Sequence, residues 1–134
     1  MLHEELTSEI INTFYTVYND LGYGFLEKVY ETALLHELRK RGIQAQRQIP
    51  IKVYYDGVIV GEYFADILVD GKVILELKAA KVISKGHKAQ LINYLKATGI
   101  EVGLIMNFGP KPTFERRVFT KKKFKNPRKS ARSA

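Results

Sequence analysis

Apolar side chains recur at helical spacing over about the first 40 residues of the chain. One stripe predicts an amphipathic helix over residues 6–21, and a second, from Leu26 to Leu38, predicts another helix. Basic residues 39–41 followed by Gly42 are typical of the end of that second helix. The residues of the first stripe are Leu6, Ile10, Ile11, Phe14, Val17, Tyr18 and Leu21.

The pattern then changes to the alternation that is typical of strands. Residues 49–55 alternate apolar and polar positions, and residues 58–69 and 72–79 read as two further strands. The intervening pairs Asp56-Gly57 and Asp70-Gly71 are strong signals for tight hairpin turns. The sequence therefore predicts an antiparallel meander of three strands.

A third helix and a buried strand complete the pattern. We expect the helix over residues 87–97, closed by Gly99, and a strand over 101–108 whose nearly continuous apolar run fits burial on both faces. Residues 114–120 then read as a last edge strand. The order α-α-β-β-β-α-β-(β) in 134 residues predicts one α+β domain with three layers, α/β/α.

The composition excludes several kinds of site and indicates a cellular location. The chain has no cysteine, which excludes disulfides, thiolate zinc sites and iron–sulfur clusters and is compatible with a reducing cytoplasm. Its N-terminus is acidic, without the apolar core of a signal peptide, and no apolar run reaches the length of a membrane span. We therefore expect a cytoplasmic protein with no membrane partner.

The net charge of +8 is concentrated at the C-terminal end. Residues 116–134 hold nine basic and no acidic residues, which leaves residues 1–115 with a net charge of −1. We expect a domain over residues 1–120 and a basic, disordered tail over 121–134, in which Lys121, Lys122, Lys123 and Lys125 contact nucleic acid. The alternative is a tail that only keeps the protein soluble.

Two carboxylates and an amine are predicted to meet on the meander. In the third strand Glu76 and Lys78 point to the same face, and charges inside a sheet need partners. A two-residue turn would pair Val69 with Lys72 and Asp66 with Leu75. Asp66 would then lie beside Glu76 but one register step away, so that a bulge or bend is needed to correct its facing.

This set fits metal-assisted chemistry at a phosphate. Asp66, Glu76 and the Leu77 carbonyl are the oxygen ligands that Mg²⁺ or Mn²⁺ prefers. Such an ion polarises a phosphoryl oxygen and lowers the pKa of a bound water, which Lys78 would orient or deprotonate. The alternative interpretation is an exposed strand face that carries a Glu/Lys pair.

Three helical residues extend the set. Glu27 lies beside the apolar stripe of the second helix, and Gln90 and Tyr94, four residues apart, project from one face of the third. A helix packed over the meander would direct Gln90 and Tyr94 at the carboxylates. The alternative is an ordinary polar residue and a half-buried aromatic ring; His87 is interpreted as a residue of the helix start.

Four segments together resemble a known family. Residues 24–30 match the motif GxxExxY, and residues 65–70, 73–79 and 89–95 hold the acidic, lysine and Gln-x3-Tyr motifs. The chain thus resembles the GxxExxY proteins, a group within the PD-(D/E)xK nuclease superfamily, from about Leu6 to Phe108. Ala65 stands where the superfamily usually has proline, a residue that shapes the strand and carries no chemistry.

The resemblance implies a restriction-endonuclease-like αβββαβ core with a mixed central sheet. It also implies that Glu27, Asp66 and Glu76 bind the metal and that Lys78 is the catalytic lysine. Gln90 and Tyr94 would position the nucleic acid or the metal-bound water.

The expected function is a metal-dependent nuclease that hydrolyses phosphodiester bonds with Mg²⁺ or Mn²⁺, in DNA more than in RNA. Exonuclease and endonuclease activity are both compatible with the sequence. The alternatives are a catalytically silent nucleic-acid-binding module and a scaffold subunit of a repair or defence complex. In a chain this short, a homodimer or a partner protein would supply substrate specificity.

Overall fold

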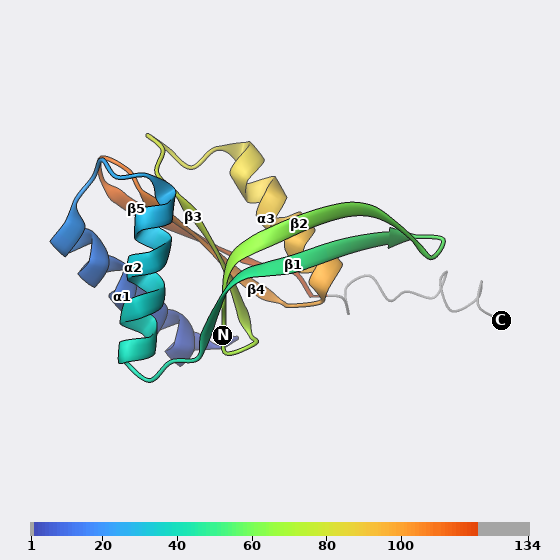
Figure 1. Cartoon of the computed structure of the whole chain (residues 1–134), viewed down its shortest axis with the longest axis horizontal. Helices are drawn as coiled ribbons and strands as arrows, with labels where there is room; N and C mark the ends of the chain where they lie inside the picture. Colours follow the sequence, from blue (N-terminus) through green and yellow to red (C-terminus); the bar gives the residue numbers. More distant parts are fainter. Residues whose placement is uncertain (1, 121–134) are drawn as a thin grey trace.

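The computed structural model describes residues 2–120, which form three helices and five strands (Figure 1). The elements are α1 (Glu4–Leu21), α2 (Glu27–Lys40), β1 (Ala45–Tyr55), β2 (Val58–Val69), β3 (Val73–Lys78), α3 (Lys85–Thr98), β4 (Val102–Phe108) and β5 (Pro112–Val118). Every predicted element is present, and the meander β1–β2–β3 is confirmed.

The five strands form one mixed sheet in the order β1-β2-β3-β4-β5. β3 and β4 run parallel and the other neighbours run antiparallel. α3 connects the two parallel strands, as a parallel pair requires. All residues of β4 are buried, which confirms the interpretation of its continuous apolar run, and β5 lies at the sheet edge as predicted.

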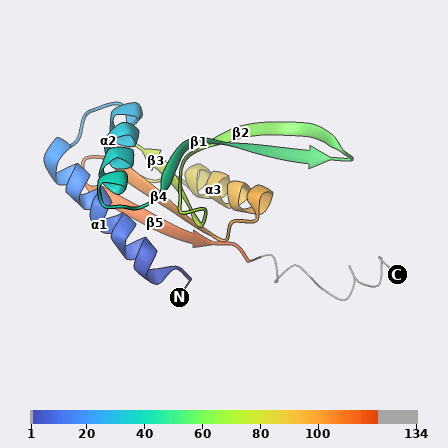
Figure 2. The ribbon, with the colours of Figure 1, turned by 60° about the horizontal axis from the view of Figure 1, so that its bottom comes forward.

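Helices cover both faces of the sheet, so the architecture is the predicted three-layer α+β fold (Figure 2). α1 and α2 pack on one face, where Phe14, Leu34 and Leu75 belong to the larger apolar core. α3 packs on the other face, where Leu91 and Ile74 belong to a second core. The successive residues of β3 therefore alternate between two buried environments.

The β1–β2 hairpin is much longer than the rest of the sheet. β1 and β2 pair from Ala45–Val69 to Tyr55–Val58, whereas β2 pairs with β3 only through residues 67–69. The outer part of the hairpin, residues 50–64, projects from the body as a two-stranded ribbon that we call the arm (Figure 1). Asp56 and Gly57 form its turn with φ of 53° and 76°, as the Asp-Gly signal predicts.

The predicted register between β2 and β3 was wrong by one residue. Val69 lies opposite Val73, not Lys72, because Lys72 is taken into the turn and donates its N–H to the Val69 carbonyl at 2.9 Å. Continued by one step, this register places Asp66 opposite Glu76. The backbone is also irregular at this point, as the prediction required, because the β1–β2 ladder skips Gln48 and Asp66.

The start of β1 also differs from the prediction. The strand begins at Ala45, four residues before the expected Ile49, because Ala45, Gln46 and Arg47 pair with the end of β2. Gln48 interrupts the ladder with a φ of 51°. The alternation of side chains therefore breaks there, which hid this part of the strand in the sequence.

None of the helices within residues 2–120 has the length and apolar character needed to cross a membrane. The expected tail, residues 121–134 with Lys121, Lys122, Lys123 and Lys125, lies outside the described residues.

Candidate active site

The site forms where β2 separates from β3. Beyond Ile67–Leu75 the backbone ladder stops, and side chains replace it. The Asp66 N–H donates to Glu76 Oε2 at 3.0 Å, and the Leu77 N–H donates to Asp66 Oδ2 at 2.7 Å. The two carboxylates therefore hold the strands together at the point of separation and lie close to each other.

Burial and like charge make this carboxylate pair electrostatically unusual. Burial and then the Asp66 charge raise the pKa of Glu76 to about 8, against the lowering effects of the Asp66 N–H and Lys78. Burial also raises the pKa of Asp66, although its hydrogen bond from Leu77 opposes the shift. Paired carboxyls with raised pKa values are typical of functional sites, and a bound cation would relieve the repulsion between them.

α2 brings two more carboxylates to the site. Glu27, in its first turn, accepts a hydrogen bond from the Ala79 N–H at 3.2 Å and so joins the helix to the end of β3. Glu31 is 4% exposed and is held by Arg47 Nη2 at 2.9 Å and Gln48 Nε2 at 2.7 Å. Both charges raise the pKa of Asp66.

Glu31 is the site residue that the sequence analysis missed. With Glu27, Asp66 and Leu77 it lines a small cavity of about 250 Å³. The signal for it was available, since Glu31 follows Glu27 by four residues and such residues share a helix face.

The segment after Lys78 is clamped by a buried amide. Asn107 lies beside Lys78 in the parallel ladder and is fully buried. Its Oδ1 accepts the Ala80 N–H at 2.9 Å, and its Nδ2 donates to the Ala80 carbonyl at 2.9 Å. This clamp fixes the backbone two residues beyond Lys78, whose charge lowers the pKa of both Asp66 and Glu76.

α3 presents the two predicted positioning residues toward the arm. Gln90 and Tyr94 line one groove between α3 and the arm. Burial and then the charges of Glu76 and Asp66 raise the pKa of Tyr94 to about 12, so its hydroxyl lies within electrostatic reach of the carboxylates. His87 forms a capping box with Ser84 at the helix start, as expected.

The possible metal ligands of the site are carboxylate and carbonyl oxygens, which is the type of ligand that a hard divalent cation prefers. Within residues 2–120, no group of three His, Cys, Asp or Glu side chains is arranged to hold an ion as it stands. Asp66 and Glu76 provide the adjacent pair, and each is engaged with a backbone N–H.

Comparisons with known proteins bear on the family and the fold. A family model described as the PD-(D/E)XK nuclease superfamily matches residues 4–118. A solved structure described as "Crystal structure of SSO0001" superposes with a TM-score of 0.55 and 19% sequence identity, over 69% of this chain and 50% of that one. This chain therefore spans half of that solved chain, and the likeness concerns the fold. The search of curated proteins gave no match.

Proposed function

Because the chain belongs to the PD-(D/E)XK nuclease superfamily, matched over residues 4–118, we propose that it is a metal-dependent nuclease that hydrolyses phosphodiester bonds, with DNA preferred over RNA. The motif at residues 24–30 further supports membership of the GxxExxY group. A cytoplasmic location stays a prediction from the sequence.

The adjacency of Asp66 and Glu76 is the observation on which the proposal rests. Burial raises the pKa of both carboxyls, and the Asp66 charge raises that of Glu76 further, so the charged pair is costly for the folded protein unless a cation joins it. A structural pair of this kind would usually be replaced by one acid and one base. The arrangement is therefore better suited to binding a cation than to stabilising the fold.

Each residue has a role that its position supports. Asp66 and Glu76 would hold Mg²⁺ or Mn²⁺, with the Leu77 carbonyl or Glu27 as a further ligand. Such an ion supplies Lewis-acid polarisation of the phosphoryl oxygen and a water of lowered pKa. Lys78, at the exit of β3, would orient that water or accept its proton and offset the charge that develops on the phosphate.

Gln90 and Tyr94 would position the substrate from α3. They line the groove between α3 and the arm, and the charges of Glu76 and Asp66 act on the Tyr94 hydroxyl. The basic residues of 121–134 would add sequence-blind affinity for phosphates.

Replacement of Lys78 by alanine tests the proposal directly. We expect the variant to retain the fold and to bind Mn²⁺, and to cleave about 10²–10⁴-fold more slowly than the parent chain. The measurement is cleavage of labelled single-stranded, duplex and branched DNA, with matching RNA, in Mg²⁺ and in Mn²⁺.

Lys72→Ala is the matched control, because Lys72 lies at the opposite end of β3 and pairs with Asp70 on the surface at 3.4 Å. Its rate should equal that of the parent. Equal rates for Lys78→Ala and the parent, or no cleavage of any substrate by the parent, would contradict the proposed activity. In the second case, the silent nucleic-acid-binding module predicted as an alternative would account for the site.

A further inference from the structure

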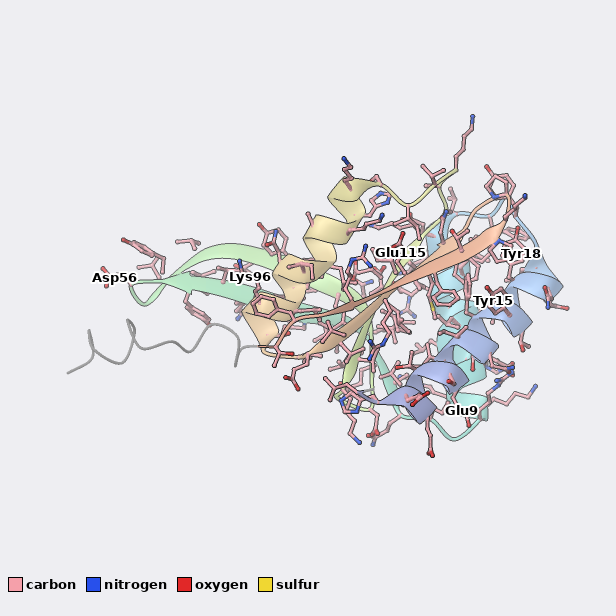
Figure 3. All side chains as sticks on the ribbon, turned by 180° about the vertical axis from the view of Figure 1, so that it is seen from behind. Glu9, Tyr15, Tyr18, Asp56, Lys96 and Glu115 are labelled. Carbon is pink, nitrogen blue, oxygen red and sulfur yellow. The ribbon has the colours of Figure 1, made fainter. Side chains whose placement is uncertain are left out.

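A groove of about 600 Å³ runs between α3 and the arm. On the arm side it is lined by Ile51, Val53 and Tyr63, and on the helix side by Gln90, Asn93 and Lys96. Figure 3 shows Lys96 on α3 beside the arm and Asp56 at the tip of the arm. The two walls therefore come from separate elements and differ in chemistry.

The arm wall consists of buried Ile51, half-buried Val53 and one exposed aromatic ring, Tyr63. Tyr63 lies opposite Ile51, so the two side chains share the face that turns toward α3, and Tyr63 is 47% exposed. Tyr55 lies farther out on the same strand, beyond a shift of register at Val53/Tyr54, and is 74% exposed. Exposed aromatic rings are platforms on which unpaired bases stack.

The helix wall of the groove carries one cation, Lys96, among neutral residues. Residues 77–100, which contain α3, include five lysines and no acidic residue. Lys88 is partly neutralised by Glu115 at 3.1 Å, whereas Lys96 is exposed and lines the groove. Lys96 on one wall and the Tyr63 ring on the other could contact the phosphates and the bases of a nucleic-acid strand.

Tyr94 is the residue of the groove that is within electrostatic reach of the carboxylates. The rings of Tyr94 and Tyr63 lie 5.8 Å apart between centroids. The charges of Glu76 and Asp66 act on the Tyr94 hydroxyl. A strand in the groove would therefore lie against Tyr94, the groove residue on which the charges of the candidate active site act.

We propose that this groove binds a single-stranded segment of nucleic acid, with bases stacked on Tyr63 and Tyr55 and phosphates toward Lys96. This proposal rests on the proposed nuclease function for the cleavage of the strand at the inner end of the groove. What it adds is the class of substrate. Stacking on the arm needs exposed base faces, and these are covered in a duplex. The site thus selects unpaired strands or frayed ends over continuous double helix.

The test is binding of fluorescein-labelled dT20 and of a 20-base-pair duplex by the full chain, measured by anisotropy in EDTA; about 20 nucleotides is longer than the roughly 4–16 of a typical site. We expect tighter binding of dT20 than of the duplex. Tyr63→Leu keeps the apolar contact with α3 but removes the stacking platform, and it should weaken dT20 binding roughly 5- to 100-fold. Tyr54→Leu is the matched control on the outer face of the arm and should bind like the parent.

A second pair of variants tests the helix wall in case Tyr63→Leu disturbs folding. Lys96→Ala should reduce the slope of log affinity against log salt by about 0.7 for dT20. Lys52→Ala, on the outer face of the arm, should leave that slope unchanged. Residues 121–134 are present in every variant, so their contribution cancels in each comparison.

The outcomes separate this proposal from the proposed function. Binding of dT20 that is indifferent to both Tyr63→Leu and Lys96→Ala overturns the groove proposal, even if the protein cleaves DNA. Specific loss of dT20 binding in these variants supports it, even if no cleavage is found. A dimer of the parent that dissociates in Tyr63→Leu, seen by light scattering, overturns it in favour of a second copy of the chain on the arm.

Discussion

Asp66 and Glu76 accept hydrogen bonds from backbone N–H groups on opposite strands, and this exchange holds the acids together despite their charge. The sequence was sufficient to predict that these two acids and Lys78 lie near one another, because a short turn joins their strands. It was not sufficient to predict the exchange itself, which depends on a register set by Lys72. The spacing of Glu31 from Glu27 was visible in the sequence, but its burial was not, because it depends on Arg47, a partner from another element.

The raised pKa of Glu76 predicts a specific dependence of stability on pH. Its value of about 8 lies above the ordinary 4.5, so between these values the folded protein holds a proton that the unfolded chain releases. The free energy of unfolding should therefore decrease, on the order of a few kcal/mol, as pH rises through this window. Thermal unfolding in EDTA at about pH 5.5 and about pH 8.5 measures this decrease.

Glu76→Gln should show a smaller decrease, since only Asp66, whose pKa is also raised, would still contribute. Mn²⁺ should raise the melting temperature of the parent more at high pH, because the ligands must be deprotonated, and should have little effect on the variant. Identical pH profiles for the two proteins would show that Glu76 is not the titrating group.

The clamp made by Asn107 gives a second prediction at this scale. Asn107→Ala leaves the N–H and carbonyl of Ala80 without their buried partner, which should cost about 1–3 kcal/mol of unfolding free energy. It should also slow cleavage, because the clamped backbone follows Lys78. Denaturant unfolding measures the first effect, with Asn19→Ala, exposed on α1, as a control expected within about 0.5 kcal/mol of the parent.

Among the elements, α3 and β4 show how closely the layers approach. Gly103 in β4 lies under Leu91 of α3, and a Cβ at Gly103 would meet Leu91 Cδ1 at 2.6 Å. The elements themselves followed from periodicity, and the parallel pairing of β3 with β4 is the arrangement expected when a helix connects two strands. The missing side chain at Gly103 had no signal in a single sequence, because the contact joins segments that are distant along the chain.

Gly103→Ala should therefore destabilise the protein by about 1–3 kcal/mol through overpacking. Leu91→Val in the same chain should recover part of the loss by making room. Gly86→Ala provides the contrast, since its Cβ would meet only Ser84 Oγ at 3.6 Å in the first turn of α3, and it should be neutral or stabilising. Chemical denaturation of the parent, Gly103→Ala, Gly103→Ala with Leu91→Val, and Gly86→Ala measures these differences. A Gly103→Ala variant as stable as the parent would mean that α3 can shift away from β4.

At the scale of the whole molecule, the projecting arm and most of the net positive charge belong to different parts of the chain. The arm could not be foreseen as a projection, because alternation predicts a strand without saying where its neighbours end. The net charge of +8, by contrast, could be located from the sequence alone, since seven of the basic residues lie in 121–134. The body and the basic end are therefore expected to contribute separately to binding.

Deletion of residues 121–134 should accordingly lower affinity for nucleic acid without removing preference for single strands. Each phosphate contact that is lost should reduce the slope of log affinity against log salt by about 0.7–0.9. Titrations of dT20 and duplex at several salt concentrations measure both quantities. An unchanged slope would mean that these basic residues do not contact the phosphates.

The projecting ribbon also creates an aggregation hazard. Val58, Ile59 and Val60 at its end are 61%, 42% and 60% exposed, and residues of high β-propensity on an unpaired strand edge invite other chains to add strands. Only a few charges, Glu62 among them, act as gatekeepers there. Glu62→Thr should therefore precipitate at a lower protein concentration than the parent in a concentration series. In the same series, a short oligonucleotide that covers the ribbon should delay precipitation of the parent.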